Sequence, residues 1–402
     1  MNPYFNHLRK ILILSKYQEL EASRLYTELI YKRVADYLAS EKTIFTTTMV
    51  PSEILAAFEA VSIDSEEVAP IIESMGQGPN SEAEECRNAV LRLGMGKDVC
   101  PYPLVTMGAF ERGLLSVPAA FIGSSYMCND QYEMIKALAQ RHKRPLFIID
   151  IPSWHDSAAI GYVENQLYEM VDFIADILNK PFNYSKFKEA MECSHEAYSI
   201  SELIKQKRRY GLDVPGTEFI YFYGIQVLAG YKDSLAVFNK LHEECAQRLC
   251  DKRRLRVFWM NVLPLRKKTV IRSMIKKYNL DFVYDELSTC NMAPVSGHNP
   301  FISLAMKLLS GLYLDGIERR KRLAEEVIRD YQIDLACGFS YSRCKLVSGG
   351  TGDIRHIFQQ AEIPYLEWKV KTASGSEIPD EQIKADFDSV MQAIRIRKGS
   401  KP

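Results

Sequence analysis

Three cysteines of this 402-residue chain, Cys100, Cys128 and Cys344, stand in loop-like segments with Pro, Gly or Ser nearby. The sequence around each of them predicts that the cysteine lies at the C-terminal end of a strand or in the loop just after it. In an α/β protein such loops meet at one crevice, so thiols far apart in sequence can converge there. Three thiolates around one centre would suit an iron–sulfur cluster or a zinc ion.

The other cysteines have a simpler interpretation as small packing residues. Four of them, Cys86, Cys193, Cys245 and Cys250, fall on helical patterns. Cys290 and Cys337 compete as ligands, although Cys337 lies within a strand pattern, where packing is expected. No C-x-x-C pair occurs, which argues against a zinc ribbon or a ferredoxin-like cluster. The residues alone leave a three-cysteine site and plain packing both open.

Charge and hydropathy exclude several partners. Lys plus Arg and Asp plus Glu are equal at 51 each, so no global field favours nucleic acid or an anionic membrane. No apolar run approaches the ~20 residues that span a bilayer. The first 16 residues lack the apolar stretch and cleavage site of a signal peptide. We therefore expect a cytoplasmic protein that keeps its thiols reduced.

The elements that must position the cysteines alternate between strand and helix. Strand patterns cover residues 117–123, 145–150, 256–260, 280–284, 333–337 and 363–367. Helical patterns cover residues 3–39, 130–142, 158–178, 183–208, 216–230, 233–251, 267–278, 299–312, 317–329, 352–361 and 379–397. This alternation predicts an α/β fold with two doubly wound parallel-sheet domains that face a cleft. The expected division is an N-terminal helical segment (1–40), a first α/β domain (41–180), a helical connection (181–215) and a second α/β domain (216–402).

Five segments carry a resemblance to a known family. They are Thr46-Thr47-Thr48-x-x-Pro51-x-Glu53, Asp98-Val99-Cys100-x-Tyr102 with Gly108 downstream, Cys128-Asn129, residues 145–151, and Cys344-Lys345-x-x-Ser348. In this order they resemble the homologous subunits of activator-dependent 2-hydroxyacyl-CoA dehydratases and of ATP-dependent benzoyl-CoA reductases. The resemblance covers most of the chain, although no single motif is specific.

The resemblance implies a cofactor, partners and an activity. It implies a [4Fe–4S] cluster held by Cys100, Cys128 and Cys344 between two α/β domains, with the fourth iron free of protein thiolate. It also implies a separate ATP-dependent iron–sulfur activator, a homologous second subunit (or self-pairing) and an acyl-CoA substrate. The activity would be reversible removal of water from an (R)-2-hydroxyacyl-CoA through a ketyl radical on the thioester.

Two further residues enter as catalytic candidates through the same resemblance. Thr48 matches a hydroxyl residue near the substrate, with an N-cap of the helix entered at Pro51 as the alternative. Glu66 matches an acid–base residue, with a solvated surface carboxylate as the alternative. The turn at 348–352 predicts the start of a helix, where its glycines would let backbone amides approach a phosphate or a cluster sulfide.

Other functions stay open at this point. A benzoyl-CoA-type reductase subunit, a double-cubane reductase that recruits Cys290 and Cys337, a non-catalytic electron-relay subunit and a cluster-free α/β binding protein all fit the sequence. After the last strand only Glu367 is acidic and Lys369 and Lys371 follow, which departs from the acidic pair common in the family and leaves the acyl group undetermined.

Overall fold

A computed structural model describes residues 3–15, 18–75, 80–126, 128–250, 254–289, 293–295, 299–371, 375–397 and 399. The chain forms two compact units that are not continuous in sequence. Unit 1 comprises Met1–Ser201, Gly224–Leu241 and Asn291–Leu314, and unit 2 comprises Glu202–Tyr223, His242–Cys290 and Asp315–Pro402. The second and third segments of unit 1 fall inside the range expected for the second α/β domain. As boundaries of independently folding domains, the ranges from the sequence stay a prediction.

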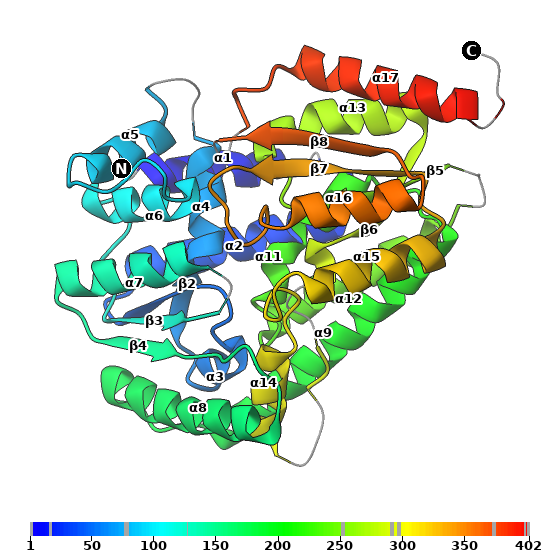
Figure 1. Ribbon diagram of the computed structural model, residues 1–402. Coiled ribbons are helices and arrows are strands. Elements are labelled where there is room, and N and C mark those ends of the chain that lie inside the picture. The colour runs from blue at the N-terminus through cyan, green and yellow to red at the C-terminus, as the bar shows by residue number, and fades with distance from the viewer. Residues whose placement is uncertain are drawn as a thin grey trace. The chain divides into compact units, whose positions relative to one another are not determined.

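Unit 1 is built on a four-stranded parallel sheet in the order β2-β1-β3-β4 (Figure 1). Its strands are β1 (Thr43–Thr46), β2 (Val61–Asp64), β3 (Ala120–Ser124) and β4 (Leu146–Ile149). The phenyl rings of Phe45, Phe110 and Phe121 meet in edge-to-face pairs beside β1 and β3, the geometry that aromatic rings favour. These three rings are buried and form part of the core of unit 1.

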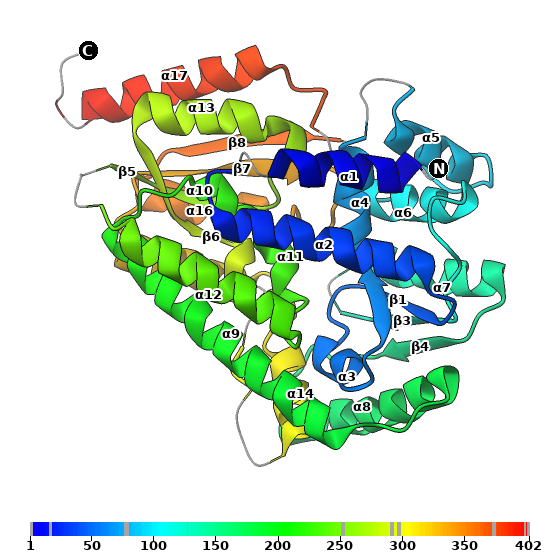
Figure 2. The same ribbon diagram turned by 180° about the vertical axis from the view of Figure 1, so that it is seen from behind.

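Helices cover this sheet. The helices of unit 1 are α1 (Pro3–Ser15), α2 (Glu21–Ala39), α3 (Ser52–Ala57), α4 (Ser65–Glu73), α5 (Glu82–Leu91), α6 (Pro101–Glu111), α7 (Asn129–His142), α8 (Ser157–Leu178) and α14 (Pro300–Leu309). The successive helices α4, α5, α6 and α7 pack against one another, with α4 on β2 and α7 on β3, while α2 packs on β2 and α8 on β4. Helix α2, blue in Figure 2, packs against β2 of this unit.

Unit 2 repeats the scheme with a parallel sheet in the order β6-β5-β7-β8. Its strands are β5 (Leu255–Met260), β6 (Leu280–Asp285), β7 (Leu335–Tyr341) and β8 (Tyr365–Val370). Its helices are α10 (Gly216–Tyr221), η1 (Leu265–Lys267), α13 (Lys268–Tyr278), η2 (Leu287–Thr289), α15 (Glu318–Tyr331), α16 (Thr351–Gln360) and α17 (Asp380–Arg397). One layer contains α10, α13 and α17, and the other contains α15 and α16 (Figures 1 and 2).

Three helices, α9 (Tyr184–Tyr210), α11 (Tyr223–Gln226) and α12 (Lys232–Gln247), have residues in both units. The fold is α/β with two doubly wound parallel sheets, as the sequence predicts. Among the described residues, no helix is both long enough and apolar enough to cross a lipid bilayer.

Four expectations about individual elements need correction. Strands β1 and β2 were not predicted, because each has only four residues and lies close to a polar turn. The helix expected over 3–39 is two helices, which end at Ser15 and begin again at Glu21. The helix expected over 216–230 is the short pair α10 and α11. Cys250 lies beyond the end of α12 and is half-buried, so it is not a helical packing residue.

Candidate functional site

The carboxyl edge of the unit 1 sheet has a point where the strand order reverses, between β1 and β3. The chain leaves these two strands in opposite directions, and in α/β sheets this divergence opens the crevice in which ligands bind. Thr47 follows β1 here, and its hydroxyl accepts a hydrogen bond of 3.2 Å from the Ser124 amide at the end of β3. Thr48 and Cys128 therefore belong to the two loops that leave the sheet where its strand order reverses.

The first turn of α7 organises the residues around the crevice. Cys128 is the N-cap residue of this helix, and Gln131 lies three positions further along. The Gln131 side-chain oxygen accepts hydrogen bonds of 3.4 Å from the Thr48 amide and from the Ser65 hydroxyl. Its amide nitrogen donates to the Glu66 carboxylate. One glutamine thus links the loop after β1 and the first turn of α4, which follows β2 directly, to the helix that Cys128 begins.

Glu66 is not the solvated surface carboxylate that the sequence left as an alternative. It is half-buried in the first turn of α4, where the Asp64 side chain accepts from its amide at 2.9 Å. Burial raises the pKa of Glu66 to about 7, although the hydrogen bond from Gln131 acts in the opposite direction. A carboxyl group with this pKa can accept or release a proton near neutral pH.

Thr48 is buried, and it is not an N-cap. The cap position of α3 belongs to Pro51, and no side chain bonds the amides of that helix end. The Thr48 hydroxyl has no hydrogen-bond partner in the described part of the chain. Met49 follows with φ 73°, a left-handed conformation that is uncommon for a residue with a side chain and often marks functional sites. A ligand in the crevice could give this hydroxyl the partner it lacks.

The position of Cys100 differs from the expectation. No strand precedes it, because the chain arrives from α5 through a turn, and Cys100 is the N-cap residue of α6. The Cys100 amide donates a hydrogen bond of 2.8 Å to the Asp130 carboxylate in the first turn of α7. The starts of α6 and α7, and with them Cys100 and Cys128, are therefore joined through neighbouring residues of one unit.

Cys344 lies in unit 2, in the loop after β7, which is where the sequence placed it. The order of that sheet reverses between β5 and β7, so this loop leaves the unit 2 sheet at the position where ligands bind in many α/β proteins. The Val347 amide donates to the Cys344 sulfur at 3.4 Å, and the Ser348 hydroxyl accepts from the Tyr341 amide. Cys128 and Cys344 hence occupy the same topological position, after the third strand of the order in each sheet.

The chemistry of these three thiols fits a thiolate-bound group. All three are half-buried, whereas Cys86, Cys193, Cys245 and Cys337 are buried. Burial raises the pKa of Cys86 and of Cys245 to about 12, which keeps these thiols protonated. Cys100 and Cys128 stand at helix starts, where the helix dipole favours a thiolate. Amide donation to sulfur favours the same state at Cys344.

Two of the expected ligands, Cys100 and Cys128, lie in unit 1, and the third, Cys344, lies in unit 2. Among the described residues, no three His, Cys, Asp or Glu side chains are grouped in a way that could hold a metal ion. Cys337 is confirmed as a buried strand residue, and Cys290 lies outside the described residues. The turn at 348–352 does begin a helix, α16, with Gly350 as its N-cap residue at φ 74°.

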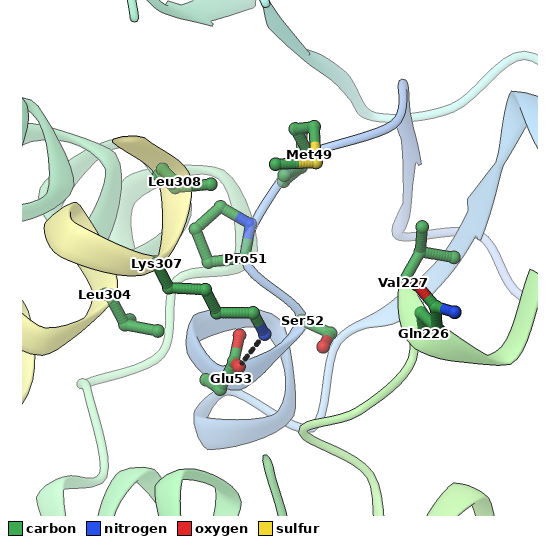
Figure 3. A pocket seen from close by; sticks show the side chains of 10 residues that line it. Met49, Pro51, Ser52, Glu53, Gln226, Val227, Leu304, Lys307 and Leu308 are labelled. Atoms are coloured by element: carbon green, nitrogen blue, oxygen red, sulfur yellow. Dashed lines mark hydrogen bonds and ion pairs between the residues drawn. The ribbon is translucent and has the colours of Figure 1, made fainter. Parts of the chain in front are cut away.

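Two residues of unit 1 were missed from the sequence. Gln131 carries no motif, and the only signal was its place three residues after Cys128 in the first turn of a predicted helix. Lys307 lies in a helix that is distant in sequence, yet its ammonium group pairs with Glu53 at 2.6 Å (Figure 3). No pattern along the chain links these two positions.

Comparison with known proteins identifies the family of this chain. A family model described as "2-hydroxyglutaryl-CoA dehydratase, D-component" matches residues 47–394. The chain is also 24% identical over 166 residues to the (R)-phenyllactyl-CoA dehydratase alpha subunit of Clostridium sporogenes, which covers 39% of this chain and 40% of that protein. The alignment therefore spans less than half the length of that relative. By the extent of the family match, the chain belongs to the 2-hydroxyglutaryl-CoA dehydratase D-component family.

Proposed function

We propose that this chain is an iron–sulfur subunit of an activator-dependent (R)-2-hydroxyacyl-CoA dehydratase. The observation that carries the proposal is the hydrogen-bonded group of residues at the point where the strand order of the unit 1 sheet reverses. There Gln131, three residues after Cys128, is bonded to both Thr48 and Glu66. Family membership supports the reaction class, and the relative named as a dehydratase subunit supports a multi-subunit enzyme.

In the proposed holoprotein, Cys100, Cys128 and Cys344 hold a [4Fe–4S] cluster. When bound, this cluster would supply one-electron chemistry and an open iron site for a substrate oxygen, with the electron delivered by an ATP-dependent iron–sulfur activator. Cys100 and Cys128 stand at the starts of α6 and α7, and a helix start favours the thiolate that ligation needs.

The remaining residues act on the acyl-CoA itself. The Thr48 hydroxyl donates a hydrogen bond to an oxygen of the bound thioester, which supplies the partner that this buried group lacks. The α-hydroxyl departs as hydroxide, and Glu66 accepts the proton that leaves the β-carbon and passes it to this hydroxide, which becomes water. The electron that entered the thioester as a ketyl radical is returned at the end, so the net reaction is loss of one water. A pKa of about 7 suits this exchange in both directions.

Metal analysis of the anaerobically purified and reconstituted protein tests the proposal. We expect close to four irons and four sulfides per chain, which are lost in Cys100→Ala, Cys128→Ala and Cys344→Ala. Cys245→Ala is the matched control, because this thiol is buried and protonated, and it should keep its iron. A wild-type chain with less than one iron after reconstitution would refute the cluster, and equal iron in all four variants would refute the ligand assignment.

Turnover tests the reaction separately. With activator, ATP, reductant and partner subunit, the wild type should form 2-enoyl-CoA from (R)-2-hydroxyacyl-CoA. Glu66→Gln should keep its iron and lose turnover by about a hundredfold or more, the range expected for an acid–base group. Full turnover in Glu66→Gln would exclude the role given to this residue.

A further inference from the structure

Two buried arginines of unit 2 pair with consecutive acidic residues at the end of β6. Arg208 of α9 pairs with Asp285 at 2.7 Å. Arg320 of α15 donates two hydrogen bonds to the carboxylate of Glu286, one of them 3.2 Å long. All four side chains are at most 3% exposed. Because an apolar pair of similar volume is often as stable as a buried ion pair, the other contacts of these arginines are informative.

The two arginines differ in what else they bind. All hydrogen bonds that Arg208 donates within the described part of the chain go to residues 282–288, in β6 and just after it. Arg320 instead donates from Nη1 to the carbonyl oxygen of Gly349 at 2.8 Å. Gly349 lies five residues after Cys344, in the loop that follows β7. Arg320 therefore connects the end of β6 to the loop that carries Cys344.

Residues 344–349 form a tight turn, which we call the cysteine turn. The Ser348 amide donates to the Cys344 carbonyl at 3.2 Å, and the Gly349 amide donates to the Lys345 carbonyl at 3.0 Å. The Val347 amide donates to the Cys344 sulfur at 3.4 Å. A Cβ atom added to Gly349 would lie 2.1 Å from the Lys345 carbonyl oxygen. Because the backbone and the sulfur of Cys344 are bonded within this turn, a displacement of the turn displaces the sulfur.

The start of α15 contacts the end of the cysteine turn at two neighbouring points. One is the hydrogen bond from Arg320 to Gly349. The other is Ile317, the N-cap residue of α15, since a Cβ atom added to Gly350 would lie 2.4 Å from its Cδ1 atom. Glu286, which holds the guanidinium of Arg320, is itself fixed to the sheet, because its amide donates to the backbone of β5 at 3.1 Å. The sheet, α15 and the cysteine turn are thus joined through one guanidinium.

We propose that Arg320 is a positioning residue, which fixes the cysteine turn and with it the Cys344 sulfur before any group binds there. The inference rests on the proposed function only for the identity of that group as an iron–sulfur cluster. A guanidinium suits this task, because its planar fork binds the Glu286 carboxylate and the Gly349 carbonyl at the same time, which a single ammonium group does not. A ligand that is already in place loses less conformational freedom on binding.

Hydrogen exchange of the iron-free chain, measured by mass spectrometry, tests the positioning directly. Arg320→Lys keeps a charge opposite Glu286 but loses the bond to Gly349. The amides of the cysteine turn should then exchange about tenfold faster, the change expected from the loss of one such hydrogen bond. The amides of β5, β6 and β7 should keep their wild-type rates. An equal acceleration throughout unit 2, or none in the turn, would overturn the proposal.

Arg208→Lys is the matched control. Arg208 is as buried as Arg320 and pairs with the carboxylate next to Glu286, but its hydrogen bonds do not reach the cysteine turn. The two variants should therefore lose similar amounts of stability against denaturant, while only Arg320→Lys accelerates exchange in the turn. The same acceleration of the turn in both variants would contradict the role given to Arg320.

A double variant covers the case in which Arg320→Lys fails to fold. Arg320→Met combined with Glu286→Leu leaves no unpaired charge in the interior, and such a replacement of a buried pair is often neutral or stabilising. It also removes the link to Gly349. The cysteine turn should therefore exchange about tenfold faster than in the wild type although the fold is stable. Full protection of the turn in this variant would refute the positioning role.

Iron release separates this proposal from the proposed function. From reconstituted protein, a chelator should remove iron about tenfold faster in Arg320→Lys than in the wild type or in Arg208→Lys, because a displaced Cys344 holds its ligand less well. A wild-type chain that takes up no iron but shows the local exchange pattern would refute the proposed function and keep the role of Arg320. Iron-loaded wild type and Arg320→Lys with equal release and equal exchange would do the opposite.

Discussion

At the residue scale, Gln131 holds the candidate site together. Its side chain is bonded to Thr48 in the loop after β1, and to Ser65 and Glu66 in the first turn of α4. None of these bonds could be derived from sequence, because each joins positions more than sixty residues apart and depends on the register of β1, β2 and β3. We regard Gln131 as a positioning residue, since it acts through Glu66.

Gln131→Leu should move the titration of Glu66. The hydrogen bond from Gln131 lowers the pKa of Glu66, so its loss should raise that pKa above about 7. The limb of the pH–rate profile that reports ionised Glu66 should shift to higher pH, while the iron content stays unchanged. The control is Gln140→Leu, an exposed position on the same helix. An unshifted profile would show that Gln131 has only a structural role.

The titration of Glu66 should also affect the pH dependence of the free energy of unfolding. Its folded-state pKa is raised from 4.5 to about 7, so the folded chain binds more protons than the unfolded chain between these values. The stability that Glu66 contributes is therefore fully present below about pH 4.5 and is lost as pH rises through about 7. Denaturant unfolding should show that Glu66→Gln flattens this part of the pH dependence. The same slope in the variant would place the titration elsewhere.

Individual residues also show which features of the candidate site could be predicted from the sequence. The surroundings of Cys128 and Cys344 followed from the strand patterns before them, because a buried strand followed by a Gly- or Ser-rich loop is a local signal. Cys100 was misjudged, because Val99-Cys100 resembles a strand end, whereas its position depends on Asp130 in another helix. The burial of Glu66 was not predicted, because burial of a helix-start carboxylate depends on what packs over it.

At the element scale, the position of Cys100 depends on how closely α5 and α6 pack. Gly108 lies in the middle of α6, and a Cβ atom there would lie 2.1 Å from the Cys86 carbonyl oxygen of α5. Only a residue without a side chain permits this contact. The separation of the two helices determines where α6 begins, and Cys100 is the residue at that point.

Gly108→Ala should therefore destabilise unit 1 and disturb Cys100. We expect a loss of about 1–3 kcal/mol in the free energy of unfolding, the usual cost of overpacking, with reduced iron content. Gly161→Ala is the control, because a Cβ atom at this α8 position meets nothing within 4 Å. It should be neutral or stabilise by about 0.5–1 kcal/mol. Equal thermal denaturation curves for the two variants would contradict this account.

The unpredicted elements share a physical cause. Strand β1 has the sequence Thr-Ile-Phe-Thr, and its four residues suit a strand, but the adjoining Thr47, Thr48 and Pro51 resemble a helix start. The strand exists because β2 and β3 pair with it on both sides. Pairing of this kind is a tertiary effect, and the sequence of a short segment does not predict it. Longer elements such as α8 and α9 were predicted to within about two residues.

At the scale of the whole molecule, sequence order does not match structural membership. Helix α14 belongs to unit 1 because it packs against α8, although it follows β6 of unit 2 in the chain. The helical patterns in the second half of the chain did not predict this packing. An amphipathic pattern shows that one face of a helix is buried, but it does not show which element covers that face. A small pocket of unit 1 that Met49 lines (Figure 3) depends on that return of the chain, because α14 supplies Leu304, Lys307 and Leu308.

The proposed cluster makes a further demand on the whole molecule, because its ligands come from both units. A group that binds only the native state stabilises it, by about 2.7 kcal/mol when its concentration is a hundred times the dissociation constant. For units of about 200 residues this corresponds to a rise of roughly 5–10 °C in melting temperature. Iron-loaded protein should therefore melt higher than protein treated anaerobically with an iron chelator.

The decisive comparison uses cysteines from each unit. Cys128→Ala in unit 1 and Cys344→Ala in unit 2 should each abolish the whole difference between loaded and chelated protein, because the loss of one ligand removes the shared group. Cys245→Ala should retain it. If Cys344→Ala kept the stabilisation while Cys128→Ala lost it, the group would be held by unit 1 alone, and ligation by both units would be wrong.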